Sequence, residues 1–453
     1  MKKIALFFLA LTLPGLAGAD VRDGRNSAAE GTRKGNFQIV AENVCTLVAP
    51  RLKDRCESVQ PERRILSGNI VEYSFRVPVG KGTHDVIGIH RVVKEIAPWF
   101  PARSTRSLMM AHGDIWNFRA AFLSDPARNL PVFLARNGVD VWGIDFGWSL
   151  VPASVTDFSF MKNWGIERDA RDLGVAIAVA RGIRFATGNG LGKMPLLGWS
   201  RGGQIGHAYL DRESQTPLWL RQVRGFIPVD IYLKTDDEEI REAACTRYES
   251  SLPSWEAGTY ENRNGTLVAT IWQLATTNPG GASPILPGFT NRQASLAVGS
   301  MTFLFFPPDL GPAPLYHFTG GTFDAQGRPT GLLYTPEATL LALEKGSAPY
   351  QPAKELLDAD AAVCDDDDIA EVAFDDHLGD IKVPVLYVAG NGGIGSYGVY
   401  TTTLLGSQDV TSLVIDLQPP AAQLAEFGHA DIFLATNAEA LVWQPILSWL
   451  QSH

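Results

Sequence analysis

The stretch Gly198-Trp199-Ser200-Arg201-Gly202 decides the fold, because of what stands on either side of it. The apolar run Pro195–Leu197 precedes it and has the composition of a buried strand, and Gln204–Leu210 follows with residues that favour a helix. A strand that turns directly into a helix strains the backbone at the turn, and flanking glycines remove the Cβ atoms that would clash there. The sequence therefore predicts a nucleophile elbow that raises the Ser200 hydroxyl at a helix start, where the helix dipole favours negative charge.

Short apolar runs alternate with helix-length spans around this turn. A hairpin is expected first, because Val71–Val77 alternates apolar and polar residues and Asp85–Val93 does so after a Gly-Lys-Gly turn. The later apolar runs are continuous, which predicts parallel strands covered by helices on both faces. The expected strands are Leu108–Ala111, Val139–Ile144, Pro195–Gly198, Gly225–Val229, Pro384–Ala389 and Ser412–Ile415, and the expected helices are Phe118–Asn137, Ile166–Thr187, Gly203–Arg212 and Glu439–Gln451. The predicted fold class is α/β, with a mostly parallel, doubly wound sheet that begins with an antiparallel hairpin.

The alternation stops between Lys234 and Asp380, in a segment rich in Gly, Pro, Thr and aromatic residues. Because this segment separates two strands, we predict an inserted cap over residues 235–379 and a core formed by residues 65–234 and 380–453. The cap's aromatic side chains either form its own core or face the site as an apolar pocket. The acidic run Asp365–Asp368 lacks the ligand spacing of a calcium loop, so a solvated acidic face is predicted there.

The first residues have the pattern of a secretory signal peptide. Lys2 and Lys3 precede the apolar stretch Ile4–Leu13, and Ala17-Gly18-Ala19 supplies the small residues that signal peptidase requires. We therefore expect residues 1–19 to be removed by cleavage after Ala19, and the protein to be periplasmic or secreted. Residues 20–64 form an N-terminal extension that is expected to be irregular as far as Asn43.

The cysteine count agrees with such a compartment, because an even number of thiols can pair fully where disulfides persist. Four cysteines allow three connectivities, and we favour Cys45–Cys56, which closes a short loop, with Cys245–Cys364, which brackets a long one. A zinc site is the weaker alternative, since no C-x-x-C spacing is present.

Composition excludes other classes of protein. The chain has 453 residues, 45% of them hydrophobic, and a net charge of −10, which argues against a nucleic-acid partner. No internal stretch has the ~20 apolar residues of a membrane-spanning helix. The residues singled out here call for no metal and no organic cofactor.

A serine hydroxyl becomes a useful nucleophile when a base takes its proton, and His429 is placed to do so. It lies in Glu426–Asp431, a loop that follows the last expected strand and precedes the final helix. An oxyanion hole needs two backbone N–H groups, for which we select Asp114, after the strand Leu108–Ala111, and Arg201, after the nucleophile. The Asp114 side chain should turn away from the oxyanion, and its alternative role is to cap the next helix.

These features together resemble the α/β-hydrolase fold, and more narrowly the acid lipase group of gastric and lysosomal lipases. The resemblance covers Leu66–Asp236 and Asp380–Gln451 and leaves the cap without an obvious match. The motifs that carry it, in chain order, are Val86–Arg91, His112-Gly113 with Trp116, Gly138–Trp142, the elbow and Gly428–Phe433. The resemblance implies that Ser200 is the nucleophile, His429 the base, and the amides of Asp114 and Arg201 the oxyanion donors.

The resemblance also implies an acid in the loop after Pro384–Ala389, but that loop, Gly390–Ser396, contains no carboxylate. Three aspartates remain. Asp409 precedes its strand and so lies at the opposite edge of the sheet, and the direction of Asp416 depends on register. Asp230 ends the strand Gly225–Val229 on the edge where Ser200 lies. We therefore predict Asp230 as the acid, with a cap hinge or a helix cap as its alternative role.

The predicted function is hydrolysis of a carboxylic ester, with a small-molecule or lipid-like apolar ester as the partner. Amide or peptide cleavage and acyl transfer use the same residues and stay open. A dehalogenase or epoxide hydrolase is disfavoured, since those enzymes need a carboxylate where Ser200 stands. Outside the enzymes, the alternative is a non-catalytic binding protein of the same fold, which the missing acid and the unusual Asp114 favour.

Overall fold

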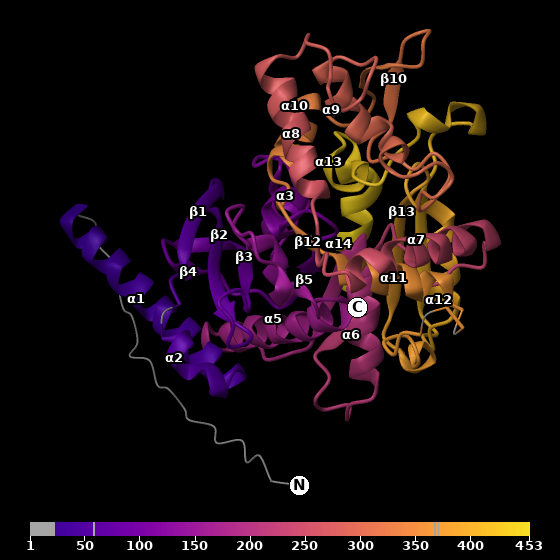
Figure 1. Ribbon diagram of the computed structural model, residues 1–453. Helices are drawn as coiled ribbons and strands as arrows, with labels where there is room; N and C mark the ends of the chain where they lie inside the picture. The colour runs from indigo at the N-terminus through magenta and orange to yellow at the C-terminus, as the bar shows by residue number, and fades with distance from the viewer. Residues whose placement is uncertain (1–22, 58, 367, 370) are drawn as a thin grey trace.

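The computed structural model describes residues 23–453 except residues 58, 367 and 370. The predicted signal peptide, residues 1–19, lies outside the described residues. Figure 1 shows a central sheet with helices on both sides and, above one end of it, the segment that joins two of its strands.

Ten strands of the described part of the chain form the central sheet. They are β1 (Glu62–Ser67), β2 (Ile70–Pro78), β3 (Val86–Ala97), β4 (Phe100–Pro101), β5 (Arg106–Ala111), β6 (Val139–Asp145), β7 (Met194–Trp199), β8 (Val223–Val229), β13 (Val385–Gly390) and β14 (Val410–Ile415). Their order is β1-β2-β3-β6-β5-β7-β8-β13-β14, with β4 paired to β3. The pairs from β6 to β14 are parallel, and β1, β2 and β3 are antiparallel to their neighbours. The predicted sheet and its initial hairpin are thus confirmed, and β1 is an added edge strand.

Two layers of helices bury the apolar strands. One layer contains α1 (Asp23–Val48), α2 (Lys53–Cys56), α5 (Ile166–Ala186) and α6 (Arg201–Ser214). The other contains α3 (Phe118–Leu123), α4 (Leu130–Arg136), α13 (Asp431–Leu434) and α14 (Gln444–Ser452), which a π-helical turn over Glu439–Trp443 precedes. α12 (Val399–Thr403) lies between β13 and β14.

Two expectations about helices were wrong. The span Phe118–Asn137 is not one helix but α3 and α4, because Pro126 disfavours helical geometry in the residue before it and Asn129 starts a new helix by accepting from Val132 N at 2.9 Å. The N-terminal extension is not irregular but contains the long helix α1. Its buried side chains Phe37, Ala41, Val44 and Cys45 stand at positions i, i+4, i+7 and i+8, which share one face of a helix.

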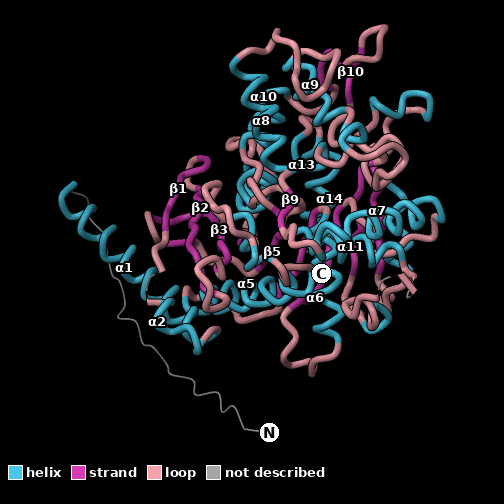
Figure 2. The backbone as a smooth tube through the Cα atoms, viewed as in Figure 1, coloured by secondary structure: helices cyan, strands magenta, loops and turns pink. Residues whose placement is uncertain are grey.

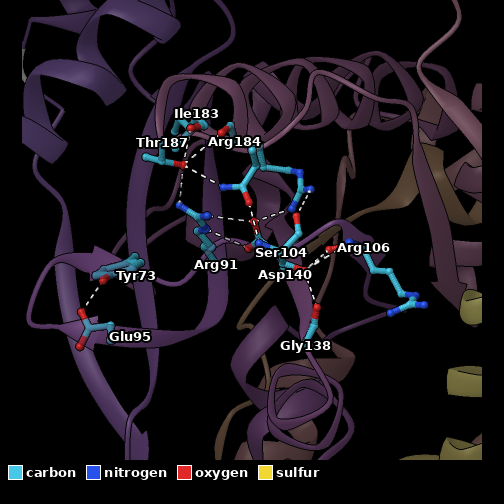
Figure 3. Close-up of polar contacts among 11 residues, drawn as sticks. Tyr73, Arg91, Glu95, Ser104, Arg106, Gly138, Asp140, Ile183, Arg184 and Thr187 are labelled. Carbon is cyan, nitrogen blue, oxygen red and sulfur yellow. Dashed lines mark hydrogen bonds and ion pairs between the residues drawn. The ribbon is translucent and has the colours of Figure 1, made fainter. Parts of the chain in front are cut away.

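Buried ion pairs stabilise the sheet near the amino-terminal ends of its parallel strands, as Figure 3 shows. Arg91 of β3 binds Asp140 of β6 through two hydrogen bonds of 2.9 Å each, and Arg184 of α5 donates to the same carboxylate at 2.6 Å. All three side chains are buried. Two guanidinium groups therefore share one carboxylate, and the cluster keeps a positive charge.

Residues 230–384 join the adjacent parallel strands β8 and β13, and we call this segment the insert. It contains α7 (Glu238–Glu256), β9 (Glu261–Asn262), α8 (Asn264–Thr277), α9 (Asn291–Ser300), β10 (Gly321–Phe323), β11 (Pro329–Leu332), α10 (Glu337–Lys345), β12 (Gln351–Pro352) and α11 (Ala353–Cys364). Helices and loops dominate it (Figure 2). Its short strands pair as β10 with β11 and β9 with β12. Asp365, Asp366 and Asp368 of the acidic run are exposed.

The cysteines pair as predicted, Cys45 with Cys56 and Cys245 with Cys364. The second bond joins α7 to α11 across 119 residues, whereas the first spans 11. Because a crosslink removes more freedom from the unfolded chain when its loop is long, we expect Cys245→Ser/Cys364→Ser to lower the free energy of unfolding by about 2–4 kcal/mol. Urea denaturation measures this loss, with Cys45→Ser/Cys56→Ser as the matched control. A larger loss in the control would contradict the loop-length explanation.

Candidate active site

Ser200 occupies the sharp turn between β7 and α6. Its backbone has φ 55° and ψ −130°, a strained conformation for a residue with a Cβ. The turn is possible because Gly198 and Gly202 have no side chains: a Cβ on Gly198 would overlap the Gly202 carbonyl, and one on Gly202 would overlap that of Ala111. Ser200 stays partly exposed, and α6 begins at the next residue. The predicted elbow geometry is therefore present.

His429 and Asp230 are in direct contact, although 199 residues separate them in the chain. Nδ1 of His429 lies 2.6 Å from Oδ2 of Asp230, and both side chains are almost fully buried. Three backbone N–H groups also donate to this carboxylate, from Gly390 and Gly395 at 3.1 Å each and from Ile394 at 3.0 Å. These four contacts hold the Asp230 side chain in a fixed orientation.

The sheet explains how Asp230 reaches this place. Trp199 of β7 is in register with Val229 of β8, so Ser200 and Asp230 leave adjacent strands side by side. The Ser200 amide donates to the Val229 carbonyl at 2.9 Å, and Asp230 adopts a positive φ of 48°. The loop after β13, which lacks an acid, supplies N–H donors to Asp230 instead. A side chain at Gly393 would collide with Oδ2 of Asp230, so glycine is required there.

The two other candidate acids lie elsewhere. Asp409 precedes β14, and its Oδ2 lies 3.1 Å from Nε2 of the last residue, His453. Asp416 follows β14 and is exposed. Neither carboxylate is placed on His429, which contacts Asp230 instead, and Ser200 lies beside Asp230 at the ends of two adjacent strands.

Aromatic side chains enclose the His429 imidazole, and the His429 side chain is 2% exposed. Trp199 stacks on it with ring centres 5.0 Å apart, and its indole N–H donates to the His429 carbonyl at 3.2 Å. Tyr316 and Phe318 of the insert contact the same ring, with their ring centres 5.3 and 5.2 Å from the centre of the imidazole. Burial raises the pKa of Tyr316, so its hydroxyl stays neutral. Part of the insert's aromatic set thus faces the site.

Asp114 and Arg201 bind each other through their side chains. The guanidinium donates from Nε to Oδ1 and from Nη2 to Oδ2, both at 2.9 Å, and although burial opposes the charged form, Asp114 raises the pKa of Arg201. The alternative role of Asp114 as a helix cap was wrong, because Asn117 caps α3 by accepting from Ala120 N at 2.9 Å. The carboxylate is turned to a cation instead. Gly113 lies against Ser200, where a Cβ would come within 2.6 Å of the serine Cβ.

Two polar residues near the site escaped the sequence reasoning. Gln351 of β12 donates to Asp114 Oδ1 and, at 3.2 Å, to Glu355 Oε2. Asp431 accepts from the Gly428 amide at 2.9 Å and from the Gly320 amide at 2.8 Å, which ties the His429 loop to the insert. Burial raises the pKa of Asp431 to about 7. Asp431 stood within the quoted motif Gly428–Phe433, whereas no local pattern marked Gln351.

No group of three or more His, Cys, Asp or Glu side chains among the described residues is arranged to hold a metal ion. No helix in the described part of the chain is long and apolar enough to cross a membrane.

Comparison with known proteins gives a match of fold. No family model matches the chain, and no curated protein does. Among solved structures, the chain is similar to a putative lipase from Sulfolobus solfataricus, with 19% identity, 87% of this chain and 99% of that chain covered, and a TM-score of 0.57. It also matches a membrane phospholipase A (12% identity, 95% of each chain, TM-score 0.39) and a thermophilic esterase from Thermogutta terrifontis (13% identity, 83% of this chain and 98% of that chain, TM-score 0.37). The first of these likenesses shows that the chain has the α/β-hydrolase fold.

Proposed function

We propose that the protein is a serine hydrolase of carboxylic esters. The observation that carries the proposal is the 2.6 Å contact between His429 Nδ1 and Asp230 Oδ2, at the sheet edge where the strained Ser200 lies. Because Asp230 occupies Nδ1, the other ring nitrogen, Nε2, is left to take a proton from Ser200. The three residues stand in the order serine, acid, histidine along the chain, as an α/β-hydrolase requires.

The chemistry follows from these roles. Ser200 Oγ attacks the ester carbonyl while His429 takes its proton, and His429 then returns this proton to the leaving alcohol. A water molecule, activated by the same imidazole, hydrolyses the acyl-serine. Asp230 stabilises the imidazolium, and its three backbone donors keep it from turning away.

The oxyanion donors of this proposal are the backbone N–H groups of Asp114 and Arg201. Arg201 is the first residue of α6, and the first N–H groups of a helix have no partner within it. Gly113 brings the chain before Asp114 against Ser200. The ion pair between the two side chains holds the two donor residues together.

Aromatic walls around His429 support an apolar ester as the substrate, either a small molecule or a lipid-like one. Phe318 contacts both His429 and, with ring centres 6.1 Å apart, the buried Trp116. The two disulfides support the proposal of a periplasmic or secreted protein. The finer resemblance to acid lipases also remains a proposal.

A fluorophosphonate probe tests the proposal directly, because it reacts with an activated serine and mimics the charged intermediate. We expect covalent labelling at Ser200, located by peptide mapping. A series of p-nitrophenyl esters of increasing acyl length, run beside matched p-nitroanilides, then separates ester from amide cleavage. Absence of labelling would favour the non-catalytic binding protein, and faster anilide cleavage would favour an amidase.

Replacing Arg201 by lysine tests the ion pair with Asp114. Lysine keeps the charge and the backbone N–H but cannot form the two parallel hydrogen bonds to the Asp114 carboxylate. The oxyanion donors should therefore shift, and kcat should fall by about 10–10²-fold with little change in KM. Steady-state kinetics on a p-nitrophenyl ester measures this. Arg292→Lys is the matched control, since Arg292 binds Glu337 in the insert through bonds of 2.8 and 2.6 Å. A raised KM at unchanged kcat would contradict the positioning role.

A further inference from the structure

An exposed apolar loop lies at the amino-terminal ends of the parallel strands, whereas Ser200 lies at their carboxyl-terminal ends. Leu218, Trp219 and Leu220 follow one another between α6 and β8, and are 71%, 76% and 51% exposed. Figure 1 shows this connection projecting beyond the end of α6. Large apolar side chains exposed in succession mark a surface that binds something.

Neighbouring segments extend this apolar surface. Arg181 of α5 links the segment that contains Leu191 to the residue Gln222 that follows the loop. It donates to the carbonyl of Leu191 at 2.9 Å and to the side chain of Gln222 at 3.3 Å. Leu191 is 44% exposed, and Phe185, four residues after Arg181 on the same face of α5, is 52% exposed. The apolar loop is therefore one part of a wider surface.

Basic side chains lie at the same end of the sheet as the loop. Arg221 lies across its base and donates to the Thr216 carbonyl at 3.0 Å. Arg106 starts β5 and Arg224 lies near the start of β8; burial, followed by the charges of Arg106 and Arg184, lowers the pKa of Arg224. Figure 3 shows the Arg106 guanidinium pointing away from Asp140, which binds Arg91 and Arg184. Positive charge thus gathers here in a chain whose net charge is −10.

The carboxylates near this surface offset only part of that charge. Glu213 is buried beneath the loop, where it accepts from the Gln222 amide at 2.6 Å. Asp380 stands to one side and accepts from Gln215 at 3.0 Å. We call Leu218–Leu220, together with Arg106, Arg181, Arg221 and Arg224, the basal patch.

The chemistry of the basal patch fits an anionic lipid surface. Tryptophan and leucine side chains on a projecting loop can enter the boundary between headgroups and acyl chains, and guanidinium groups around them can pair with lipid phosphates. A projecting tip also suits a fluid bilayer better than a rigid protein partner, which would need a matching hollow. We propose that the basal patch docks this protein on anionic membranes, with the Ser200 edge facing away from the lipid.

Vesicle co-sedimentation of the full chain tests the proposal. We expect Ser200→Ala, which consumes no lipid, to bind vesicles of equal parts phosphatidylcholine and phosphatidylglycerol far better than phosphatidylcholine alone. Salt should weaken this binding, because the Debye length falls from ~10 Å at 0.1 M to ~3 Å at 1 M. Trp219→Ser and, separately, Arg106→Gln/Arg224→Gln should each weaken it by about tenfold or more.

The controls place equivalent changes elsewhere on the surface. Leu47→Ser replaces a 79% exposed leucine on α1, and Arg76→Gln replaces an exposed arginine of β2, so neither should change vesicle binding. Equal binding to both kinds of vesicle, or unchanged binding by Trp219→Ser, would overturn the proposal. So would self-association that Trp219→Ser abolishes in the absence of vesicles, because the loop would then bind a second copy. Because the binding is measured without turnover, its failure leaves the proposed hydrolase activity untouched.

Discussion

Ser200→Ala should lower ester turnover by about 10⁴–10⁶-fold and leave the fold intact. The expected loss is large because Ser200 supplies the attacking group. Without its hydroxyl, His429 has no proton to take and the oxyanion donors have no intermediate to stabilise. The turn itself should survive, since alanine has the same Cβ as serine and the clearance at Gly198 and Gly202 is unaffected. Turnover of a p-nitrophenyl ester, followed beside circular dichroism and thermal unfolding, measures both halves of the expectation.

Two comparisons sharpen this result. Ser396→Ala changes a serine of the loop after β13 that is outside the proposed chemistry, so its turnover should equal that of the wild type. Wild-type protein that reacts with the fluorophosphonate probe while Ser200→Ala does not would locate the reactive hydroxyl. Turnover within tenfold of wild type in a folded Ser200→Ala protein would reject the serine mechanism.

The sequence was informative where local chemistry determined the structure. Continuous apolar runs such as Val139–Ile144 predicted the parallel strands, because a strand buried on both faces has no polar side to show. It was misleading where a few residues outweighed the average composition. The single stripe of Phe37, Ala41, Val44 and Cys45 holds α1 against the core, although the residues that precede the stripe are mostly polar.

The site shows the same division. The Ser200 turn depends on adjacent glycines and could be predicted from neighbours in the chain. The partner of the Asp114 side chain could not be predicted in this way, because Arg201 is 87 residues away in the chain. The local sequence was equally compatible with the alternative role of Asp114 as a helix cap. For the acid, sheet topology favoured Asp230 among three aspartates, and the contact with His429 then depends on a backbone turn at Asp230 with φ 48°. Long-range geometry of this kind is set by the packed fold as a whole.

The second large effect is expected at Asp230. Asparagine has nearly the same shape but only one acceptor oxygen, whereas Oδ1 of Asp230 accepts from two backbone amides and Oδ2 accepts from Ile394 N and His429 Nδ1. Whichever way the new amide turns, its NH₂ group faces two of these donors. The arrangement with NH₂ toward His429 favours the imidazole tautomer that cannot take a proton from Ser200, so Asp230→Asn should lower kcat by about 10⁴-fold.

Matched variants separate this role from a structural one. Asp416→Asn and Asp409→Asn make the same chemical change in the two aspartates that also competed as the acid, and both should retain wild-type turnover. Unpaired buried donors also destabilise the fold, by about 1–3 kcal/mol each, so turnover is compared at a temperature where every variant is folded. A slower reaction of Ser200 with the fluorophosphonate in folded Asp230→Asn, at unchanged KM for the ester, would show that the loss is chemical. A loss of the same size in Asp416→Asn would instead assign the acid to the exposed end of β14, and the 2.6 Å contact with His429 would then be a structural bond.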